Sequence, residues 1–437
     1  MKLDYKKTFL IGFGFFASSI AWSLYNSFIP LILKNFVGST ALIGLVMTID
    51  NVFGVIFQPL FGHLSDRTRT RFGKRMPYIM VGIPICAIAF SIIPYMPSLP
   101  AMMAVIILFN FVMSTWRSPV VALMPDVTPS PLRSKANGVI NLMGGVGSII
   151  AFLVGGRLTT IGGYPLSFAM GSIVMVFALV MLLIFIREPD ACFFPRFSRF
   201  AIGMKRHDHG CESPEAEDEE SDEAHAGQGQ SFANATRHMS AAEKRSLFGI
   251  LFAIFFWFCG YNAVETFFTS YATVVLKLDP GAAAGMLTNF SLTLVAFAIP
   301  SGILAGRVGR RRMIIIGLCG TIAVFTPMLF IDNKVLVSIL LLFGGMFWAC
   351  ININSLPMVV EMARANRIGS FTGYYYFFSF SAAIASPVLF GLLRDLTGSY
   401  RILFIYSVCA FFIALIFMLT VRHGEAKPLP DTSSGQS

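Results

Sequence analysis

The chain has 437 residues, of which 55% are apolar and only 13% are charged, and its mean hydropathy is +0.71. A soluble protein of this length would not be so apolar, so the composition predicts a polytopic membrane protein. The formal net charge is +10, but the basic residues stand in short clusters between apolar runs rather than in one patch. This distribution argues against nucleic-acid binding and indicates a topology signal instead.

Twelve apolar runs are long enough to cross a bilayer, which requires about 20 mostly apolar residues. They form two groups of six, separated by residues 188–245. Each run is expected to be a helix, so the predicted fold class is all-α. The runs are 8–32, 40–63, 76–95, 101–123, 137–160, 165–187, 246–274, 282–306, 312–331, 335–359, 369–393 and 400–421. The first run resembles a signal peptide but has no clear cleavage site, so we interpret it as a retained span.

The loops between the runs alternate in charge. Those after the second, fourth, eighth and tenth runs are basic (TRTRFGKR, PLRSKAN, GRVGRRR and ARANR), whereas those after the odd-numbered runs of each group are nearly neutral. Because basic loops stay on the cytoplasmic side, this alternation places both termini and the central segment in the cytoplasm. We expect a multi-pass protein in the lipid bilayer of the plasma membrane, or of the inner membrane in a bacterium.

The chain divides into four parts: an N-terminal six-helix bundle (1–187), a cytoplasmic acidic linker (188–245), a C-terminal six-helix bundle (246–421) and a cytoplasmic tail (422–437). Twelve of the 23 acids fall in the linker, which has few large apolar residues and is expected to be solvated and disordered. The alternative is a metal site in the linker, formed by His207, His209, Cys211 and His225.

The sequence contains no recognisable catalytic or metal-binding motif. The seven cysteines have no metal-ligand spacing, and those within apolar runs are expected to pack there. No phosphate-binding loop, H-E-x-x-H motif or nucleophile–base arrangement occurs either. We therefore expect no enzyme activity, no metal and no cofactor.

The two bundles repeat one another in sequence. RFGKRMPYIMVGI (71–83) recurs as GRVGRRRMIIIGL (306–318), and ALMPDVTPSPLRSKANGV is echoed by LPMVVEMARANRIGSFTG. In the second pair Asp126 corresponds to Glu361, and Arg133 corresponds to Arg367. A parallel six-plus-six repeat joined by a central linker is typical of two-bundle transporters.

The segment GHLSDRTRTRFGKR (62–75) resembles the loop signature between the second and third spans of the major facilitator superfamily. Its SDRTxTRFGRRxP form is similar to that of plant sucrose/proton symporters, their animal relatives and bacterial glycoside–pentoside–hexuronide symporters. The segment RSPVVALMPDVTPSPLRSKANG (117–138) resembles the same group's fourth-to-fifth-span segment. The resemblance covers all twelve spans and implies the major facilitator fold and a sugar substrate. Melibiose-type symporters carry a D-x-x-x-D-P pair used for sodium, whereas this chain has VIFQP (55–59), which favours protons as the coupling ion.

A transporter exposes a central site to each side in turn, so it needs contacts that form in one state and break in the other. Asp66 lies at the end of the second run, within reach of Arg67 and of bases that enter the third; the resemblance adds the cytoplasmic end of the eleventh run as a partner. We hypothesise that such pairs latch the cytoplasmic side, and that glycines let the backbone turn tightly there. The alternative is that the bases only fix topology. The gating residues in this hypothesis are Gly62, Asp66, Arg67, Gly73, Arg75, Asp126, Arg133, Glu361 and Arg367.

Only two acids, Asp50 and Glu265, lie deep within the apolar runs. Ionisable residues in the hydrocarbon region are costly and normally functional, and carboxyl groups there serve as proton relays. We therefore interpret both as proton-coupling residues. Arg117 lies about two turns inside the fourth run. It is either part of the central site or a side chain that snorkels to the interface.

Polar and aromatic side chains at helical spacing predict a sugar site. Trp22 and Asn26 share one helical face, as do Tyr261 and Glu265. Such a mixture suits a sugar, because amides and carboxylates hydrogen-bond its hydroxyls while its C–H face stacks on a ring. The alternative role of each amide is hydrogen bonding between helices. The predicted substrate-binding residues are Trp22, Tyr25, Asn26, Asn51, Gln58, Arg117, Asn141, Tyr261, Asn262, Asn352 and Tyr374.

These features predict a monomeric secondary transporter that moves a glycoside or another sugar together with protons by alternating access. Within transport, the alternative is a different solute, such as a drug or an organic acid, carried by the same fold. From another class, the alternative is a non-transporting membrane sensor, which would signal without solute flux.

Overall fold

A computed structural model describes residues 5–70, 72–128, 132–186, 188, 239–363 and 368–424, and the regular structure within them is helical. Helices form along the apolar runs because a helix satisfies its backbone N–H and C=O groups within one segment, as a bilayer requires. The first half contains α1 (Tyr5–Leu33), α2 (Thr40–Met47), α3 (Ile49–Arg67), α4 (Met76–Ile92), the short η1 (Ile93–Tyr95), α5 (Leu99–Val127), α6 (Arg133–Ile150), the π-helical η3 (Ala151–Gly155) and α7 (Gly156–Phe185). The second half contains α10 (Ala241–Val274), α11 (Pro280–Val308), α12 (Arg310–Phe325), the short η5 (Pro327–Leu329), α13 (Lys334–Glu361), α14 (Ile368–Thr397) and α15 (Ile402–Thr420).

The prediction of twelve spans in an all-α fold is confirmed. Eleven helical segments of the described chain are long and apolar enough to cross a membrane, and the one over residues 136–185 supplies two spans. It is bent at Gly162 and Gly163, where the backbone is non-helical and Gly163 has φ of 72°. Glycine tolerates this left-handed conformation because it has no Cβ atom. The second span is interrupted at Thr48, between α2 and α3.

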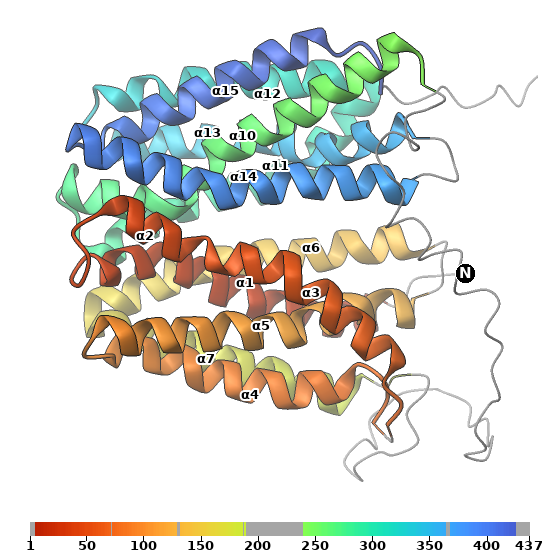
Figure 1. The fold of residues 1–437 in the computed structure, drawn as a ribbon, viewed down its shortest axis with the longest axis vertical. Helices are drawn as coiled ribbons and strands as arrows, with labels where there is room; N and C mark the ends of the chain where they lie inside the picture. Colours follow the sequence, from red (N-terminus) through yellow and green to blue (C-terminus); the bar gives the residue numbers. More distant parts are fainter. Residues whose placement is uncertain are drawn as a thin grey trace, which may run out of the picture.

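The helices form two bundles, one for each half of the chain (Figure 1). In the N-terminal bundle α1 packs against α6 and α7, and α4 packs against α5 and α7. In the C-terminal bundle α10 packs against α14 and α15, and α13 packs against α11 and α12. The bundles meet where α14 lies along α2, where α11 lies along α6 and α7, and where α1 meets α10.

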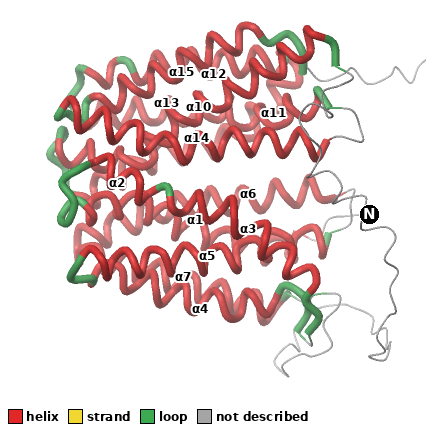
Figure 2. Tube along the Cα trace, in the orientation of Figure 1, coloured by secondary structure: helices red, strands yellow, loops and turns green. Residues whose placement is uncertain are grey.

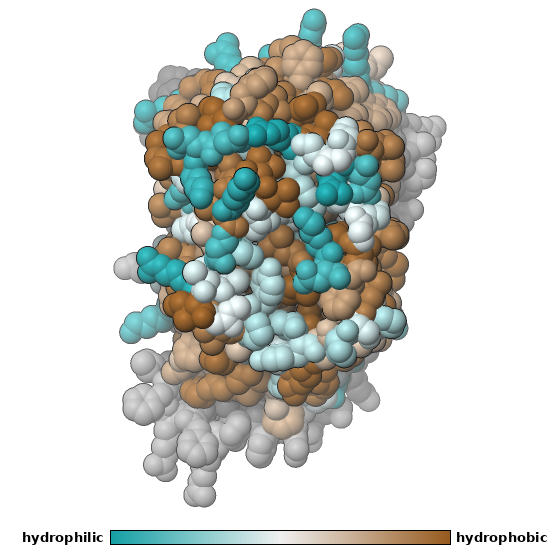
Figure 3. All heavy atoms as spheres, turned by 90° about the vertical axis from the view of Figure 1, so that its left-hand side faces the viewer, coloured by the Kyte–Doolittle hydropathy of each residue, from teal (hydrophilic) through white to brown (hydrophobic). Residues whose placement is uncertain are grey.

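The loops gather at the two ends of the molecule (Figure 2). We call one the basic end, which holds the α3–α4 hairpin, the α11–α12 hairpin and the start of α1. We call the other the neutral end, which holds the α1–α2, α10–α11 and α14–α15 loops. Figure 3 looks onto the neutral end: hydrophilic side chains gather over its middle, and hydrophobic ones crowd the rim and sides. Predictions about the linker fall mostly on residues 189–238, and those about the tail fall mostly on 425–437, outside the described residues.

The two bundles are fastened together at the neutral end. The carboxylate of Asp395 in α14 accepts hydrogen bonds from the Ser39 hydroxyl (2.6 Å) and from the backbone N–H groups of Thr40 (2.8 Å) and Ala41 (3.0 Å). On the other side of the interface Thr160 donates to Asp279. Nearer the middle of the molecule, the Thr269 hydroxyl in α10 donates to the Ser27 carbonyl oxygen in α1.

Candidate functional site

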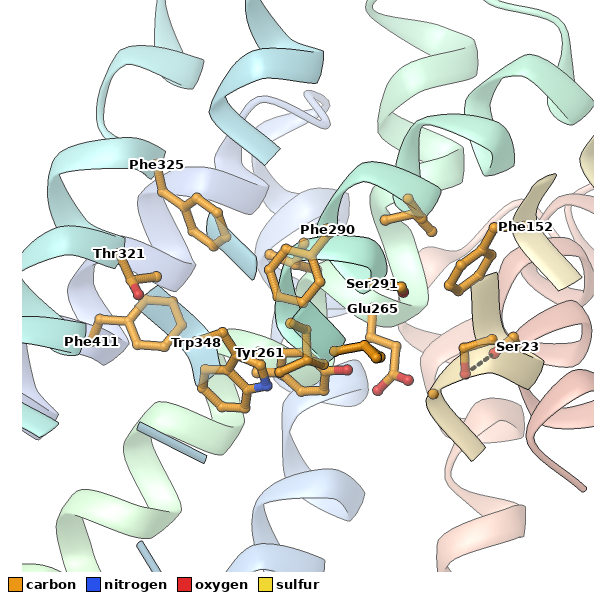
Figure 4. A pocket seen from close by; sticks show the side chains of 16 residues that line it. Ser23, Phe152, Tyr261, Glu265, Phe290, Ser291, Thr321, Phe325, Trp348 and Phe411 are labelled. Carbon is orange, nitrogen blue, oxygen red and sulfur yellow. Dashed lines mark hydrogen bonds between the residues drawn. The ribbon is translucent and has the colours of Figure 1, made fainter. Parts of the chain in front are cut away.

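A cavity of about 90 Å³ lies between the two bundles, near the middle of α10 (Figure 4). By its volume it holds several water molecules, since about 10–15 Å³ suffices for one. Aromatic rings dominate its wall, and a few polar side chains face it from both bundles. The rings belong to Phe152, Tyr261, Phe290, Phe325, Trp348 and Phe411, and the polar groups to Ser23, Ser148, Glu265, Ser291 and Thr321.

Tyr261 and Trp348 form a flat, rigid platform in this wall. Their rings are stacked, with centroids 4.3 Å apart and planes within 2° of parallel. Phe258 and Phe411 both meet the indole edge-on, and Trp348 is only 2% exposed. Aromatic pairs of this kind favour fixed geometries, so the platform keeps its orientation without a ligand.

Glu265 stands one helical turn beyond Tyr261 and points its carboxylate into the cavity (Figure 4). The carboxylate interacts with the Tyr261 hydroxyl and with the amide of Asn26 in α1. Asn26 belongs to the N-terminal bundle, so this group links the first helix of each half. Among the described residues that line the cavity, Glu265 is the one acid.

Asp50 lies in the first turn of α3 and is 5% exposed. One of its carboxylate oxygens accepts hydrogen bonds from the backbone N–H (2.6 Å) and the side-chain amide (2.7 Å) of Asn51. The charges of Arg117 and Glu265 both act on it. The Arg117 guanidinium lies 4.9 Å from the ring centroid of Trp22, so Arg117 turns towards α1 rather than snorkelling to the interface. The start of a helix stabilises negative charge, which suits a carboxylate here.

The remaining predicted binding residues lie outside the described lining of the cavity. Tyr25 is buried, stacks on Phe109 and accepts a hydrogen bond from Asn110. The amides of Asn141 and Asn262 each donate a hydrogen bond to a carbonyl one turn earlier in the same helix, so their role in binding stays a prediction. Three others, Gln58, Asn352 and Tyr374, are partly buried.

Sequence reasoning missed most of the cavity wall, above all Trp348. The residue stands one turn before Asn352, on a span where Gly344 and Gly345 come first. A Cβ atom on Gly345 would lie 2.0 Å from the Phe290 carbonyl oxygen, so glycine is what lets α13 approach α11 closely enough for these rings to share one wall. The Gly-Gly pair was the signal available in the sequence.

At the basic end, Arg75 is the centre of a charged network. It is 4% exposed and forms ion pairs with Asp66 at the end of α3 and with Asp126 at the end of α5, where Lys74 also reaches. It also donates to the Ser65 hydroxyl. Each of these ion pairs lies within the N-terminal bundle. Between described residues, the ion pair of Asp66 is with Arg75, and none is formed with α14.

The two glycines of this region play different roles. Gly73 has φ of 106°, as expected for a tight turn. The expectation of a turn at Gly62 was wrong, because the residue lies inside α3. A Cβ atom there would lie 2.9 Å from the Ser118 hydroxyl, so Gly62 permits the close approach of α3 to α5. Arg67 is the exposed last residue of α3.

In the second half, Glu361 pairs with Arg310 at 3.1 Å. This pair is the counterpart of Lys74 with Asp126. The hypothesis had matched Glu361 with Arg367, and Asp126 with Arg133. Arg367 and the Arg133 side chain lie outside the described part of the chain.

Glu188 was not singled out in the sequence, yet it is buried beside Gly73 and holds the start of α4. Its carboxylate accepts hydrogen bonds from the backbone N–H groups of Lys74, Arg75 and Met76. The first N–H groups of a helix have no partner within the helix, so a carboxylate here satisfies them. The chain beyond α7 therefore stays attached to the N-terminal bundle at least as far as residue 188.

We expect Glu188→Ala to lower the melting temperature of the purified protein. The substitution leaves three backbone donors of the α4 start without this acceptor, at a cost of about 1–3 kcal/mol for a buried group. Glu188→Gln keeps one oxygen acceptor, so its melting temperature should lie between those of the wild-type protein and Glu188→Ala. Thermal unfolding followed by tryptophan fluorescence in detergent measures the difference. An unchanged melting temperature in Glu188→Ala would show that this contact contributes nothing to stability.

A comparison with known protein families covers nearly the whole chain. The sequence model of the Major Facilitator Superfamily matches residues 11–288 and 276–436. The chain belongs to this superfamily. It is a secondary transporter and not an enzyme.

Two curated relatives resemble part of the chain. An uncharacterized symporter of Synechocystis sp., sll1374, is 29% identical over 140 residues, and the sucrose transport protein SUC3 of Arabidopsis thaliana is 24% identical over 156 residues. These matches cover 29% and 31% of the chain, and the chain spans only 26% of the length of either relative.

Solved structures of the superfamily share the fold over nearly the whole chain. The nucleoside transporter NupG superposes with a TM-score of 0.69 at 14% identity, covering 95% of this chain and 100% of that one. A bacterial homologue of the human lysosomal transporter Spinster superposes with a TM-score of 0.70 at 13% identity, covering 98% and 100%. At this identity the likeness establishes the major facilitator fold alone.

Proposed function

We propose that this transporter moves a glycoside or another sugar together with protons. The observation that carries the proposal is the stacked Tyr261–Trp348 platform beside the Glu265 carboxylate in the central cavity. A pyranose presents a flat C–H face and a ring of hydroxyls. The first suits an aromatic plane, and the second suits a carboxylate that accepts two hydrogen bonds.

In this proposal both bundles contribute side chains to the binding site. The C-terminal bundle supplies the platform, and the N-terminal bundle supplies Asn26, which reaches the Glu265 carboxylate. A solute held by both bundles joins them and so changes the free energy of their rocking motion. The cavity of about 90 Å³ is small for a sugar, so the bundles must separate for the sugar to enter.

Proton coupling rests on the two deep carboxyl groups. Glu265 faces the solute space, whereas Asp50 lies at the start of α3, where the charge of Arg117 acts on it. When Asp50 is protonated, Arg117 loses its counter-charge, and the balance between the bundles changes. We assign proton binding to Asp50 and sugar binding to Glu265. Because the charges of these two carboxylates act on one another, protonation of Asp50 also changes the electrostatic environment of Glu265.

The orientation follows from charge. We propose that the basic end faces the cytoplasm, that both termini lie there, and that the membrane is the plasma membrane or a bacterial inner membrane. The neutral-end fastening through Asp395 then closes the external side, so this structure corresponds to a state facing the cytoplasm. The ion pairs of Asp66, Asp126 and Glu361 lie within single bundles in this state, so in this proposal a latch forms only when these acids exchange partners across the interface as the cytoplasmic side closes. We propose that the monomer is the functional unit.

The names of the relatives agree with this proposal in class. One is a symporter, and the other is a sucrose transport protein. Their alignments cover only a minor part of each chain, so they support a sugar and a coupling ion without identifying either.

An organic cation is the second candidate substrate. The described lining holds one acid and no base, and six aromatic rings surround it. Aromatic faces attract cations, especially where water is excluded. Of the drug and organic-acid alternatives, this lining favours a cationic drug and disfavours an anion.

Uptake into proteoliposomes tests the assignment. The purified protein is reconstituted in liposomes that are alkaline inside and then supplied with a panel of labelled mono- and disaccharides and of aromatic cations. We expect at least one sugar to accumulate above its external concentration, and to stop doing so when an ionophore dissipates the gradient. Accumulation of cations alone would replace the sugar assignment with the second candidate. A protein that binds solutes without any flux would be a sensor.

A further inference from the structure

The basic end of the C-terminal bundle contains a second cavity, far from the chemistry of the central site. It has a volume of about 610 Å³ and lies between the α11–α12 hairpin and the residues that follow α15. Four of its eight lining residues are arginines, and the described lining contains no acid. The lining residues are Ala305, Gly306, Arg307, Val308, Gly309, Arg311, Arg312 and Arg422.

The corresponding place in the N-terminal bundle is filled by a carboxylate of the chain. IREPDA (186–191) repeats as VRHGEA (421–426), so Glu188 corresponds to His423. The two turns also match, because Gly73 and Gly309 have φ of 106° and 100° and each precedes the third helix of its bundle. Glu188 binds the backbone N–H groups after Gly73. His423 instead hydrogen-bonds the Ser246 hydroxyl in α10.

Three of the arginines are available to a ligand. Arg307, Arg312 and Arg422 are exposed, and none of their side chains forms an ion pair with a described residue. Glu361, at the end of α13, is paired with Arg310, which does not line this cavity. Several guanidinium groups around one open cavity form a site for carboxylates or phosphates, which they bind through charge and paired hydrogen bonds.

We propose that this cavity binds the acidic run of the chain's own linker, ESPEAEDEESDE (212–223). The run holds eight acids and no base, which is the charge that four arginines require. It is tethered to the same bundle. Fifteen residues, 224–238, separate it from Met239. A random-coil linker of 15 residues has an r.m.s. end-to-end distance of about 19–23 Å.

The point of attachment lies beside the cavity. The backbone N–H of Arg422 donates to the Ser246 hydroxyl, and Ser246 is about 9 Å along α10 from Ser240, at 1.5 Å per residue. The linker therefore joins the bundle next to a residue that lines the cavity. A short tether gives an effective concentration in the millimolar range, so even a weak affinity fills the site.

Peptide binding to the full chain tests the proposal. A fluorescent ESPEAEDEESDE peptide is titrated into nanodiscs of phosphatidylcholine, which carries no net charge. The acceptor is a full-length variant whose eight acids in 212–223 are replaced by their amides, so that its own linker no longer competes. We expect saturable binding that weakens about 5- to 30-fold in Arg307→Gln/Arg312→Gln, because two exposed ion pairs, each contributing up to about 1 kcal/mol, are lost. The matched control Arg67→Gln/Arg69→Gln removes the same charge from the other bundle and should stay within about twofold.

The decisive comparison is with the wild-type chain. Its own acidic run should compete for the cavity, so the peptide should bind it at least about tenfold more weakly than it binds the amide-substituted chain. Equal binding by the wild-type and amide-substituted chains would overturn the proposal, as would equal loss in the two arginine double variants. Replacing part of the lipid with phosphatidylserine tests the other source of anions. If phosphatidylserine displaces the peptide equally well from both chains through these arginines, the cavity belongs to a lipid headgroup instead.

Discussion

Asp50→Asn should abolish proton-driven accumulation of sugar while leaving sugar exchange intact. The amide mimics the protonated carboxyl group but cannot release a proton, so a pH gradient can no longer do work through this position. With one proton per sugar, a gradient of one pH unit sustains about tenfold accumulation, because each is equivalent to about 1.4 kcal/mol. The expected accumulation ratio in Asp50→Asn is one.

The comparison of two assays separates coupling from binding. Counterflow, in which unlabelled sugar inside the liposome exchanges with labelled sugar outside, needs no net proton movement and should stay near the wild-type rate in Asp50→Asn. Glu265→Gln is the matched variant, because Glu265 is the other deep carboxyl group and, unlike Asp50, it lines the cavity beside Tyr261. It should lose sugar affinity and therefore slow both assays. If Asp50→Asn still concentrates sugar in response to external acid, the coupling role falls to Glu265 alone.

Asp395→Ala should release the fastening at the neutral end and shift the population towards a state open on that side. The carboxylate accepts three hydrogen bonds from Ser39, Thr40 and Ala41 across the bundle interface. A hydrogen bond to a charged group contributes about 1.5–3 kcal/mol. Losing even one such contribution changes the ratio of the two states by about 10- to 150-fold.

Spin labels on the two bundles measure this shift. Asn35→Cys and Ser399→Cys place one label on each side of the interface, in exposed loops of the neutral end, in a background whose native cysteines are replaced. Pulsed electron–electron distances should lengthen in Asp395→Ala relative to the parent. Asp332→Asn is the control, because Asp332 pairs with Arg401 at the same end but within one bundle. An unchanged distance distribution in Asp395→Ala would show that the fastening lies elsewhere.

The sequence was sufficient for the fold because the bilayer leaves few alternatives. Apolar runs such as 76–95 and 335–359 became helices at almost the predicted bounds, since length and hydropathy alone define a span. The turn at Gly73 could also be predicted from the sequence, because a glycine between bases at the end of an apolar run has few other roles. The same loop indicated Arg75, which pairs with Asp66.

The site was only partly predictable, because the sequence does not say which face of a helix meets which neighbour. Buried acids are conspicuous in an apolar run, so Asp50 and Glu265 were singled out, whereas Trp348 is one ring among many. The binding role of amides such as Asn141 stays a prediction, since the Asn141 amide also donates a hydrogen bond within its own helix. Asp395 was hidden in a loop that counted as neutral, since its partners are mostly backbone groups 354 to 356 residues away in sequence.

Sugar-induced proton movement is the most direct measurement of the central claim, which is that one passage through the Glu265 cavity carries a sugar and a proton together. A pH-sensitive dye is trapped in proteoliposomes that have equal pH inside and outside, and the accumulating sugar from the uptake panel is added outside. Proton symport predicts acidification of the interior that begins with the sugar, scales with sugar uptake and is absent in Asp50→Asn. Sugar uptake by the wild-type protein without any acidification would contradict the account.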